Sequence, residues 1–280
     1  MATSLEGRVC VVTGPTSGIG RETAHGLARL GAQLVLACRD VAKGEVVRQE
    51  IMAESGNPRV EVRKIDLADP PSIRAFAEDF QATHARLDIL VNNAGVLSFR
   101  RRLTPAGVES HFSVNVLAPF LLTNLLLPVL KASAPSRVIN VGSATHFNGH
   151  VDFANLQGER DFHFLRAYSS SKLEILLLTY EMARRLQATG VTVNCVHPGT
   201  IRTDLYNGLP VAFRFVKFFL RSPTVGAAPI VWLASAPEVR DVSGRYFDRF
   251  KEARSAEESY DVDLARKLWS ACEGLVGAVG

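Results

Sequence analysis

The sequence predicts one α/β domain, residues 1–280, built on a doubly wound, Rossmann-like parallel sheet with helices on both faces. Its 280 residues are enough for a large domain with a deep core, and 47% hydrophobic with 21% charged residues is ordinary for a globular enzyme. Apolar runs rich in β-forming residues alternate with helical patterns along most of the chain. These runs are apolar on both faces, as strands are in a parallel sheet covered by helices on each side.

The alternation predicts each element in turn. In chain order we expect strands at residues 8–13, 33–37, 59–65, 87–91, 137–141 and 191–196, alternating with helices at 18–30, 41–55, 70–84, 105–130 and 167–189. After Val196 the alternation breaks. Residues 209–220 then combine Phe, Val and Leu with Arg214 and Lys217, which fits an amphipathic helix on the core, a substrate lid or a membrane-surface helix. We favour a lid, around residues 200–222, because ligands of an open α/β sheet bind beyond the carboxyl ends of its strands.

Charge and composition argue against several classes of protein. The net charge of +4 is small, and the basic cluster at residues 100–102 is better interpreted as a solvated loop than as a nucleic-acid-binding stripe. The four cysteines form no CxxC pair and the seven histidines form no HExxH or Cys/His cluster, so we expect a reducing compartment and no metal. The N-terminus is too short and polar for a signal peptide, and no apolar run reaches the roughly 18 residues of a spanning helix. We therefore expect a cytoplasmic protein with no nucleic-acid partner and no integral membrane segment.

A glycine-rich turn joins the first predicted strand to the first helix in the run Thr13-Gly14-Pro15-Thr16-Ser17-Gly18-Ile19-Gly20. Glycines allow close approach to a ligand, and the following helix directs free N–H groups and the positive end of its dipole at a diphosphate. The predicted cofactor contacts here are Gly14, Ser17, Gly18, Ile19 and Gly20. The spacing TGxxxGxG differs from the GxGxxG dinucleotide fingerprint. In this respect the chain resembles the short-chain dehydrogenase/reductase family.

The nucleotide preference is expected to depend on Arg39 and Asp40, which end the second predicted strand. Arg39 resembles the NADP-selecting arginine of the family, because a planar guanidinium suits the oxygens of a 2′-phosphate. Asp40 is the competing candidate, about twenty residues beyond the glycines and able to hold a ribose hydroxyl instead. A solvated Arg39 paired with Asp40 is the interpretation that involves no ligand. We favour NADP(H).

Further cofactor contacts are implied by the same resemblance. Asp66, followed by Leu67, ends the third predicted strand, where the family binds adenine, although a helix N-cap is an alternative local role. Asn93, Ala94 and Gly95 follow the fourth strand and belong to the family's NNAG motif.

A family motif of the form PGxxxT follows the sixth predicted strand. Its expected cofactor contacts are Pro198, Gly199, Ile201 and Thr203, with Thr203 and the Ile201 backbone as candidates to hold the carboxamide. His197, just before this proline, is interpreted as structural.

Four residues form the predicted catalytic group: Asn115, Ser143, Tyr168 and Lys172. Tyr168 and Lys172 are four apart and share one helical face. Ser143 follows the fifth strand, so both elements should meet at the carboxyl edge of the sheet, on the side of the glycine-rich turn. Asn115 is an amide within an otherwise apolar helix pattern and needs a polar partner.

The residue types suit hydride transfer between an alcohol and a carbonyl. A tyrosine with a pKa near 10 is a poor base, but a nearby ammonium favours the phenolate, so Tyr168 is expected to be the general acid/base, with its pKa lowered by Lys172. Ser143 would polarise the carbonyl oxygen. Tyr168 and Lys172 are also expected to contact the cofactor, Lys172 through the nicotinamide ribose, and Asn115 to position a water that relays protons.

The resemblance covers nearly the whole chain and is nearest to the retinol dehydrogenase-like branch. It rests on residues 36–40, 155–159, 167–168, 171–173 and 265–269. That branch implies NADP(H) and bulky apolar carbonyls or alcohols, with Phe147, Phe153, Phe162 and Phe164 expected near the pocket; a secondary-metabolite or lipid carbonyl is as plausible as a retinoid. Gly142 departs from the family, where a second serine is common.

Two further expectations concern function and assembly. The fold also hosts NADP-binding regulatory proteins without catalysis, but this chain keeps all four residues, so we favour an enzyme. The run at residues 120–130 is apolar nearly all round, and family members often pair through this helix and the one that carries Tyr168, so we expect a homodimer or homotetramer.

Overall fold

A computed structural model describes residues 3–201 and 221–277 of the chain. Eight strands form one sheet in the order β3-β2-β1-β4-β5-β6-β7-β8, and all neighbouring pairs are parallel except β7 with β8. The strands are β1 Val9–Thr13, β2 Gln33–Cys38, β3 Val60–Lys64, β4 Ile89–Asn92, β5 Ser136–Val141, β6 Val191–His197, β7 Tyr246–Asp248 and β8 Lys251–Glu252. The sheet order reverses direction between β1 and β4, and such switch points are where doubly wound folds bind ligands. The predicted Rossmann-like α/β domain is therefore confirmed.

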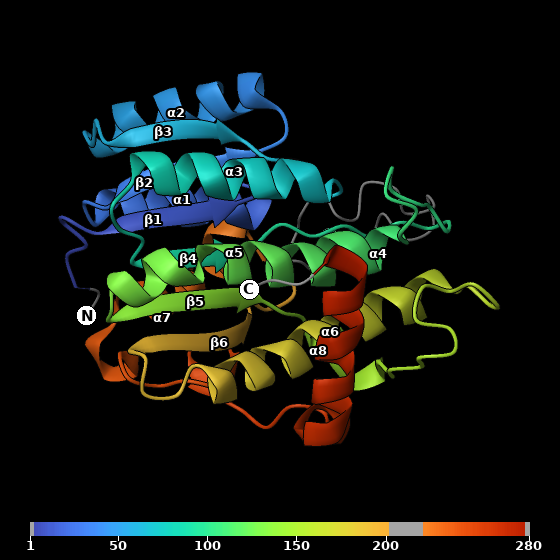
Figure 1. Cartoon of the computed structure of the whole chain (residues 1–280). Coiled ribbons are helices and arrows are strands. Elements are labelled where there is room, and N and C mark those ends of the chain that lie inside the picture. Colours follow the sequence, from blue (N-terminus) through green and yellow to red (C-terminus); the bar gives the residue numbers. More distant parts are fainter. Residues whose placement is uncertain (1–2, 202–220, 278–280) are drawn as a thin grey trace.

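Helices cover both faces of this sheet (Figure 1). They are α1 Gly18–Arg29, α2 Val41–Ser55, α3 Pro70–Thr83, α4 Ser110–Phe112, α5 Ala118–Ala132, α6 Phe164–Arg185, α7 Pro223–Ser235 and α8 Val262–Val276. One core cluster packs α3, α5, α6 and α8 on one face, and a second packs α1, α2 and α7 on the other. The strands between them are buried on both sides, which explains their continuous apolar sequences.

Three expectations about the elements were wrong. The helix predicted at 105–130 begins only at Ser110, because Gly107 has φ 78° in a turn and the Glu109 side chain caps the helix by accepting hydrogen bonds from the His111 and Phe112 N–H groups. The helix predicted at 167–189 is α6, which begins earlier and ends at Arg185. The alternation does not break after Val196, since α7 and β7 continue it; β7 is only three residues long.

The apolar helix expected to mediate oligomerisation is largely covered within the chain. Phe120, on α5, packs edge-on against Trp269 of α8 with 4.8 Å between ring centroids, and α3 lies against α5 on its other side. Contrary to expectation, the stretch Ser110–Ala132 is long and apolar enough to cross a membrane by length and composition, but 78% of its most apolar window is buried in the fold. A core helix passes the same test. The homo-oligomer stays a prediction.

Candidate active site

A cavity of about 590 Å³ lies at the carboxyl ends of β1, β4, β5 and β6, beside the switch point. It is lined by residues 14, 16–20, 93–97, 141–145, 168, 172 and 197–201. The predicted catalytic residues Ser143, Tyr168 and Lys172 therefore share one cavity with the glycine-rich turn. Arg39, Asp66 and Leu67 do not line it, nor does the side chain of Asn115.

The glycine-rich turn fits a diphosphate. Gly14 has φ 65°, and a Cβ placed on Gly20 would lie 2.1 Å from the carbonyl oxygen of Gly14, so only glycine lets the turn close this tightly. Ser17 precedes α1 in an extended conformation, but its side chain makes no capping hydrogen bond. The first N–H groups of α1 are thus left to face the cavity, where an anion would complement them and the helix dipole.

Thr13 and Asn93 join this turn to the end of β4. Thr13 Oγ1 accepts hydrogen bonds from the Asn93 and Ala94 N–H groups (3.0 and 3.1 Å), and Asn93 Nδ2 donates to the carbonyls of Thr13 and Gly14 (2.9 and 3.2 Å). The predicted NNAG residues therefore act first as a brace for the phosphate-binding turn. Ala94 and Gly95 line the cavity next to it.

Arg39 and Asp40 do not pair with each other. The Asp40 carboxylate caps α2 by accepting from the Lys43 N–H (3.1 Å), and it forms an ion pair with Lys43 Nζ at 3.1 Å. These contacts with Lys43 lower the pKa of Asp40. Arg39 is exposed at the end of β2 and makes no ion pair within the described residues. Asp40 thus has a structural role already, whereas the Arg39 guanidinium is left to a ligand or to water.

Asp66 is engaged locally as well. Its Oδ1 accepts a hydrogen bond from the Ala68 N–H (3.0 Å), and its own N–H donates to Ser72 Oγ (2.9 Å). The N-cap of α3 is Asp69, so the expected alternative, Asp66 as a helix N-cap, was wrong. Asp66 and Leu67 are half-buried at the end of β3, where contact with an adenine stays a prediction.

Lys172 lies one helical turn after Tyr168 on α6, and both side chains are buried, at 6% and 8% exposure. Lys172 Nζ donates a hydrogen bond to the carbonyl of Val141 at 3.0 Å and lies 5.7 Å from the centre of the Tyr168 ring. Burial lowers the pKa of Lys172 to about 8, and the nearby Cys195 acts in the opposite direction. The ammonium is therefore held close to the phenol in a site that makes its charge costly.

Ser143 opens the 3-10 helix η2, Ala144–Asn148, directly after β5. Its Oγ accepts hydrogen bonds from the Thr145 N–H and Thr145 Oγ1 (3.2 and 3.0 Å). Because those bonds occupy the oxygen as an acceptor, the hydroxyl hydrogen remains to donate to a ligand oxygen. This arrangement suits polarisation of a carbonyl.

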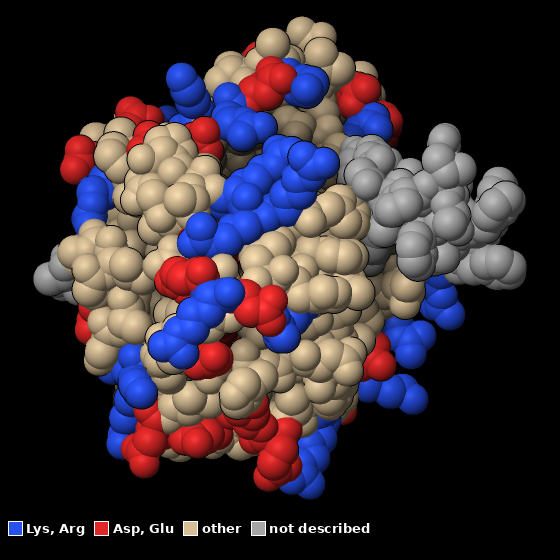
Figure 2. Space-filling model, turned by 90° about the vertical axis from the view of Figure 1, so that its right-hand side faces the viewer, with Lys and Arg blue, Asp and Glu red and all other residues tan. Residues whose placement is uncertain are grey.

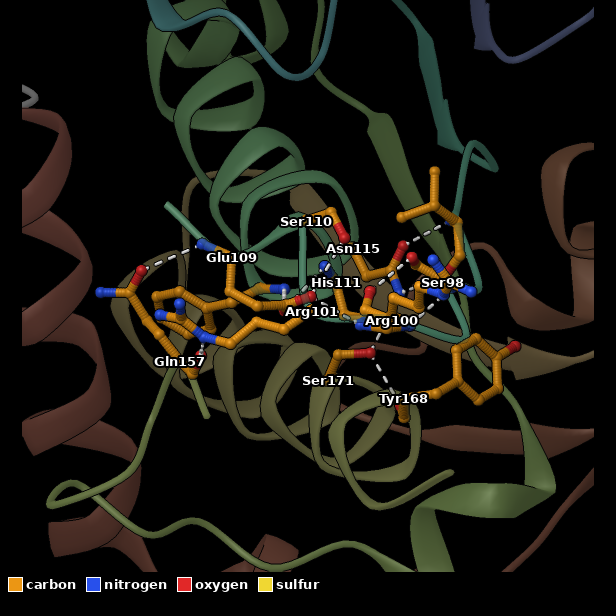
Figure 3. Close-up of polar contacts among 12 residues, drawn as sticks. Ser98, Arg100, Arg101, Glu109, Ser110, His111, Asn115, Gln157, Tyr168 and Ser171 are labelled. Atoms are coloured by element: carbon orange, nitrogen blue, oxygen red, sulfur yellow. Dashed lines mark hydrogen bonds and ion pairs between the residues drawn. The ribbon is translucent and has the colours of Figure 1, made fainter. Parts of the chain in front are cut away.

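Asn115 lies in a π-helical turn, Ser113–Leu117, between α4 and α5. Its Oδ1 accepts from the Val96 N–H (2.8 Å), and its Nδ2 donates to the Val96 carbonyl and to Ser171 Oγ (3.1 and 3.0 Å). Ser171 Oγ in turn donates to the Tyr168 carbonyl at 2.7 Å (Figure 3). The amide therefore joins the wall segment at Val96 to the catalytic helix, and the partner expected for it is found.

Sequence reasoning missed a buried pair on the same side of Tyr168, formed by Glu109 and His111 (Figure 3). Glu109 Oε1 accepts from His111 Nδ1 at 2.8 Å, and His111 Nε2 accepts from the Ser98 N–H at 2.9 Å. The hydrogen bonds from His111 lower the pKa of Glu109, although burial acts first and raises it. The His111 ring also meets the Tyr168 ring edge-on at 6.3 Å. A buried acid two residues before a histidine was the available signal.

The remaining predictions divide between the cavity and the undescribed segment. Pro198, Gly199 and Ile201 line the cavity, as does His197, whose pKa is lowered by burial. Thr203 and the expected lid at 209–220 lie outside the described residues. None of the phenylalanines expected near the pocket lines the described part of the cavity.

Basic side chains do not form a long stripe on the face shown in Figure 2. They gather in a short diagonal band, and acidic side chains lie directly beside them. Residues 100–102 are exposed, as expected of a solvated loop, and Arg101 Nε donates to the Gln157 carbonyl at 2.9 Å. Within the described residues no group of three or more His, Cys, Asp or Glu side chains is placed to hold a metal.

Known proteins resemble this chain over nearly its whole length. The family model described as short chain dehydrogenase matches residues 8–210. Retinol dehydrogenase 13 of Mus musculus is 44% identical over 284 residues, which cover 98% of this chain and 85% of that protein. An uncharacterized protein from Mycobacterium paratuberculosis has a similar structure, with a TM-score of 0.81, 31% identity and coverage of 99% and 96%. The Pseudomonas aeruginosa RhlG/NADP complex has a TM-score of 0.73, 27% identity and coverage of 88% and 95%. The chain belongs to the short-chain dehydrogenase/reductase family, in its retinol dehydrogenase-like branch.

Proposed function

We propose that the protein is an NADP(H)-dependent oxidoreductase that interconverts an alcohol with a ketone or aldehyde, and that its substrates are bulky and apolar. The observation that carries this proposal is the convergence of Ser143, Tyr168 and Lys172 on one cavity that also contains a glycine-rich anion cradle. A regulatory protein that only bound the nucleotide would have no use for a buried ammonium beside a phenol, which costs folding energy.

Each residue has a distinct part in the proposed reaction. Ser143 donates a hydrogen bond to the substrate oxygen, and Tyr168 gives that oxygen its proton during reduction or removes it during oxidation. Lys172 stabilises the phenolate form of Tyr168 by its positive charge. The nicotinamide cofactor, when bound, supplies or accepts the hydride.

The preference for NADP(H) rests on the end of β2. The Asp40 carboxylate is committed to the start of α2 and to Lys43, so it is poorly placed to hold ribose hydroxyls as well. Arg39, exposed beside it, can form charge-assisted hydrogen bonds with a 2′-phosphate. The NADP complex of a structural relative supports the same cofactor class.

The preference for an apolar substrate rests on the rim of the site and on the relatives. Val96 and Leu97 line the cavity, and Phe99 packs against Phe164 with 4.9 Å between ring centroids. Leu103 is 53% exposed on the same loop, so apolar surface is available beyond the cavity mouth. Relatives named as retinol dehydrogenases make retinoids the first substrates to test.

A substrate screen tests the proposal directly. The purified protein is incubated with NADPH or NADH and with retinal, long-chain aldehydes, aromatic ketones and small aldehydes, and cofactor oxidation is followed at 340 nm. We expect turnover with NADPH, faster for bulky apolar carbonyls than for small ones. The Tyr168→Phe protein is the matched blank. Equal rates with NADH would overturn the cofactor preference, and turnover of small aldehydes only would overturn the substrate class.

A further inference from the structure

The backbone of Ser143 is held by a histidine that the proposed reaction does not use. The Ser143 carbonyl accepts hydrogen bonds from the His146 N–H (3.2 Å) and from His146 Nδ1 (2.7 Å). The second bond is short and comes from a side chain that is 1% exposed. The position of Ser143 therefore depends on where this imidazole is fixed.

The opposite edge of the imidazole defines its protonation state. His146 Nε2 lies 3.2 Å from the Ala256 N–H, which can only donate, so Nε2 must be the acceptor. The ring hydrogen is then on Nδ1, pointing at the Ser143 carbonyl. Burial lowers the pKa of His146, which favours this neutral form. The ring is further enclosed by Tyr246, with 4.8 Å between ring centroids.

Ala256 belongs to a C-terminal segment that is itself tied to the catalytic helix. Its neighbour Ser255 shares a hydrogen bond of 2.8 Å with the hydroxyl of Tyr180, which lies on α6 twelve residues after Tyr168. Ser255 Oγ also lies 2.7 Å from Ser259 Oγ. The far end of the imidazole thus has an anchor that is fixed relative to α6.

We infer that His146 is a positioning residue that couples the C-terminal segment to Ser143, and so fixes the serine relative to Tyr168. This inference rests on the proposed function. The serine follows β5 and the tyrosine lies on α6, so nothing in the local sequence fixes the distance between their hydroxyls. The path from the Ser143 carbonyl through His146, Ala256 and Ser255 to Tyr180 closes that connection. A small displacement of a catalytic group lowers the rate of the chemical step more than it lowers binding.

Three substitutions separate the two ends of the imidazole. His146→Asn keeps a donor near the position of Nδ1, His146→Gln keeps a polar group near the position of Nε2, and His146→Phe keeps only the ring. For retinal reduction with NADPH we expect kcat to fall by about fivefold to a hundredfold in the Phe and Gln proteins and by less in the Asn protein. The KM for retinal and the Kd for NADPH should stay within about twofold. With the 4-deuterated cofactor, the kinetic isotope effect should rise in the Phe protein, because hydride transfer becomes more rate-limiting.

The matched control is His150→Ala. His150 also contacts the C-terminal segment, through an ion pair with Glu258 at 2.9 Å, but it is exposed and makes no bond to Ser143. We expect its kcat to be unchanged. An equal loss in this protein, or equal losses in the Asn and Phe proteins, would show that packing of the segment matters and not the imidazole bond, and would overturn the inference.

An activity-independent measurement keeps the inference separate from the proposed function. In protein labelled with ¹⁵N-histidine, the His146 ring should show one protonated nitrogen, Nδ1, and one unprotonated nitrogen, Nε2. The assignment comes from the signal that is lost in His146→Phe. A doubly protonated ring or the opposite tautomer at pH 7 would overturn the inference, even if retinal were reduced. Failure of retinal reduction with the expected tautomer present would instead count against the proposed function.

Discussion

Lys172 Nζ donates to the carbonyl of Val141, the last residue of β5, two positions before Ser143. One hydrogen bond of 3.0 Å thus connects the helix that carries the proposed acid/base to the strand that carries the proposed polarising serine. The same ammonium faces Tyr168. Lys172 is therefore an element of both the electrostatics and the geometry of the site.

The buried charge of Lys172 should be visible in the pH dependence of stability. Its pKa is about 8 in the folded protein, against about 10.5 in the unfolded chain. Between these values the unfolded state binds more protons, so stability should rise with pH, and below pH 8 the full cost of burying the charge is present. We expect the free energy of unfolding of wild type to increase relative to Lys172→Met from pH 8 to 10.5. Urea titrations in a Tyr168→Phe background, which removes the coupled phenol, measure this; parallel pH curves would contradict it.

Tyr168→Phe removes the phenolic hydroxyl and keeps the ring that packs against His111. We expect kcat to fall by about a hundredfold or more, as is typical for loss of a general acid/base, while the Kd for NADPH stays nearly unchanged. Steady-state kinetics and a fluorescence titration of NADPH check both parts. Retained turnover would mean that another group transfers the proton.

Arg39→Ala should weaken NADPH selectively. Loss of a charge-assisted hydrogen bond to the 2′-phosphate corresponds to about ten- to a hundredfold in affinity, whereas NADH has no group there to lose. The control is Asp40→Asn, which keeps an oxygen to cap α2 but removes the negative charge beside Arg39; it should leave NADPH binding unharmed or improved. Titration of both cofactors against both proteins decides the matter. Equal loss of NADH and NADPH in Arg39→Ala would show that Arg39 selects neither.

Gly142, where a second serine is common in the family, is matched to Cys195. A Cβ on Gly142 would lie 2.6 Å from Cys195 Sγ, so Gly142→Ala should destabilise the protein by about 1–3 kcal/mol. The double variant Gly142→Ala/Cys195→Ala should recover much of this loss. Gly274→Ala is the control, because a Cβ there meets open space within α8, and it should be neutral or stabilising by about 0.4–1 kcal/mol. Urea unfolding measures all of these; a Gly142→Ala protein as stable as wild type would show that the site relaxes freely.

The sequence predicted best those elements whose ends are determined locally. The helix expected at residues 41–55 is α2 with the same bounds, because Asp40 caps its start and Gly56, at φ 68°, ends it. The glycine-rich turn, Tyr168 and Lys172 were likewise readable, since each depends on spacing within a short run. The start of the helix that carries Asn115 was misplaced by five residues because its cap, Glu109, acts through a side chain that also binds His111.

What could not be predicted depends on contacts between distant residues. His146 meets Ala256 across 110 positions, and no pattern near either residue indicates that they touch. The reason for Gly142 also appears only when β6 brings Cys195 beside it. Likewise, Asp40 was a candidate ribose ligand in the sequence, and only its contacts with Lys43 revealed its role at the start of α2.

The π-helical turn at Ser113–Leu117 has a consequence for how this chain can vary in length. The Ala118 N–H donates to the Ser113 carbonyl five residues back, so the turn holds one residue more than an α-helical turn. Each residue of an α-helix advances the rotation by about 100°. Deleting one residue here would straighten the helix and rotate Phe120 and the rest of α5 by that angle relative to Glu109. Either the buried pair before the turn or the core face after it would then point the wrong way, so this segment can change its residue types but not its residue count.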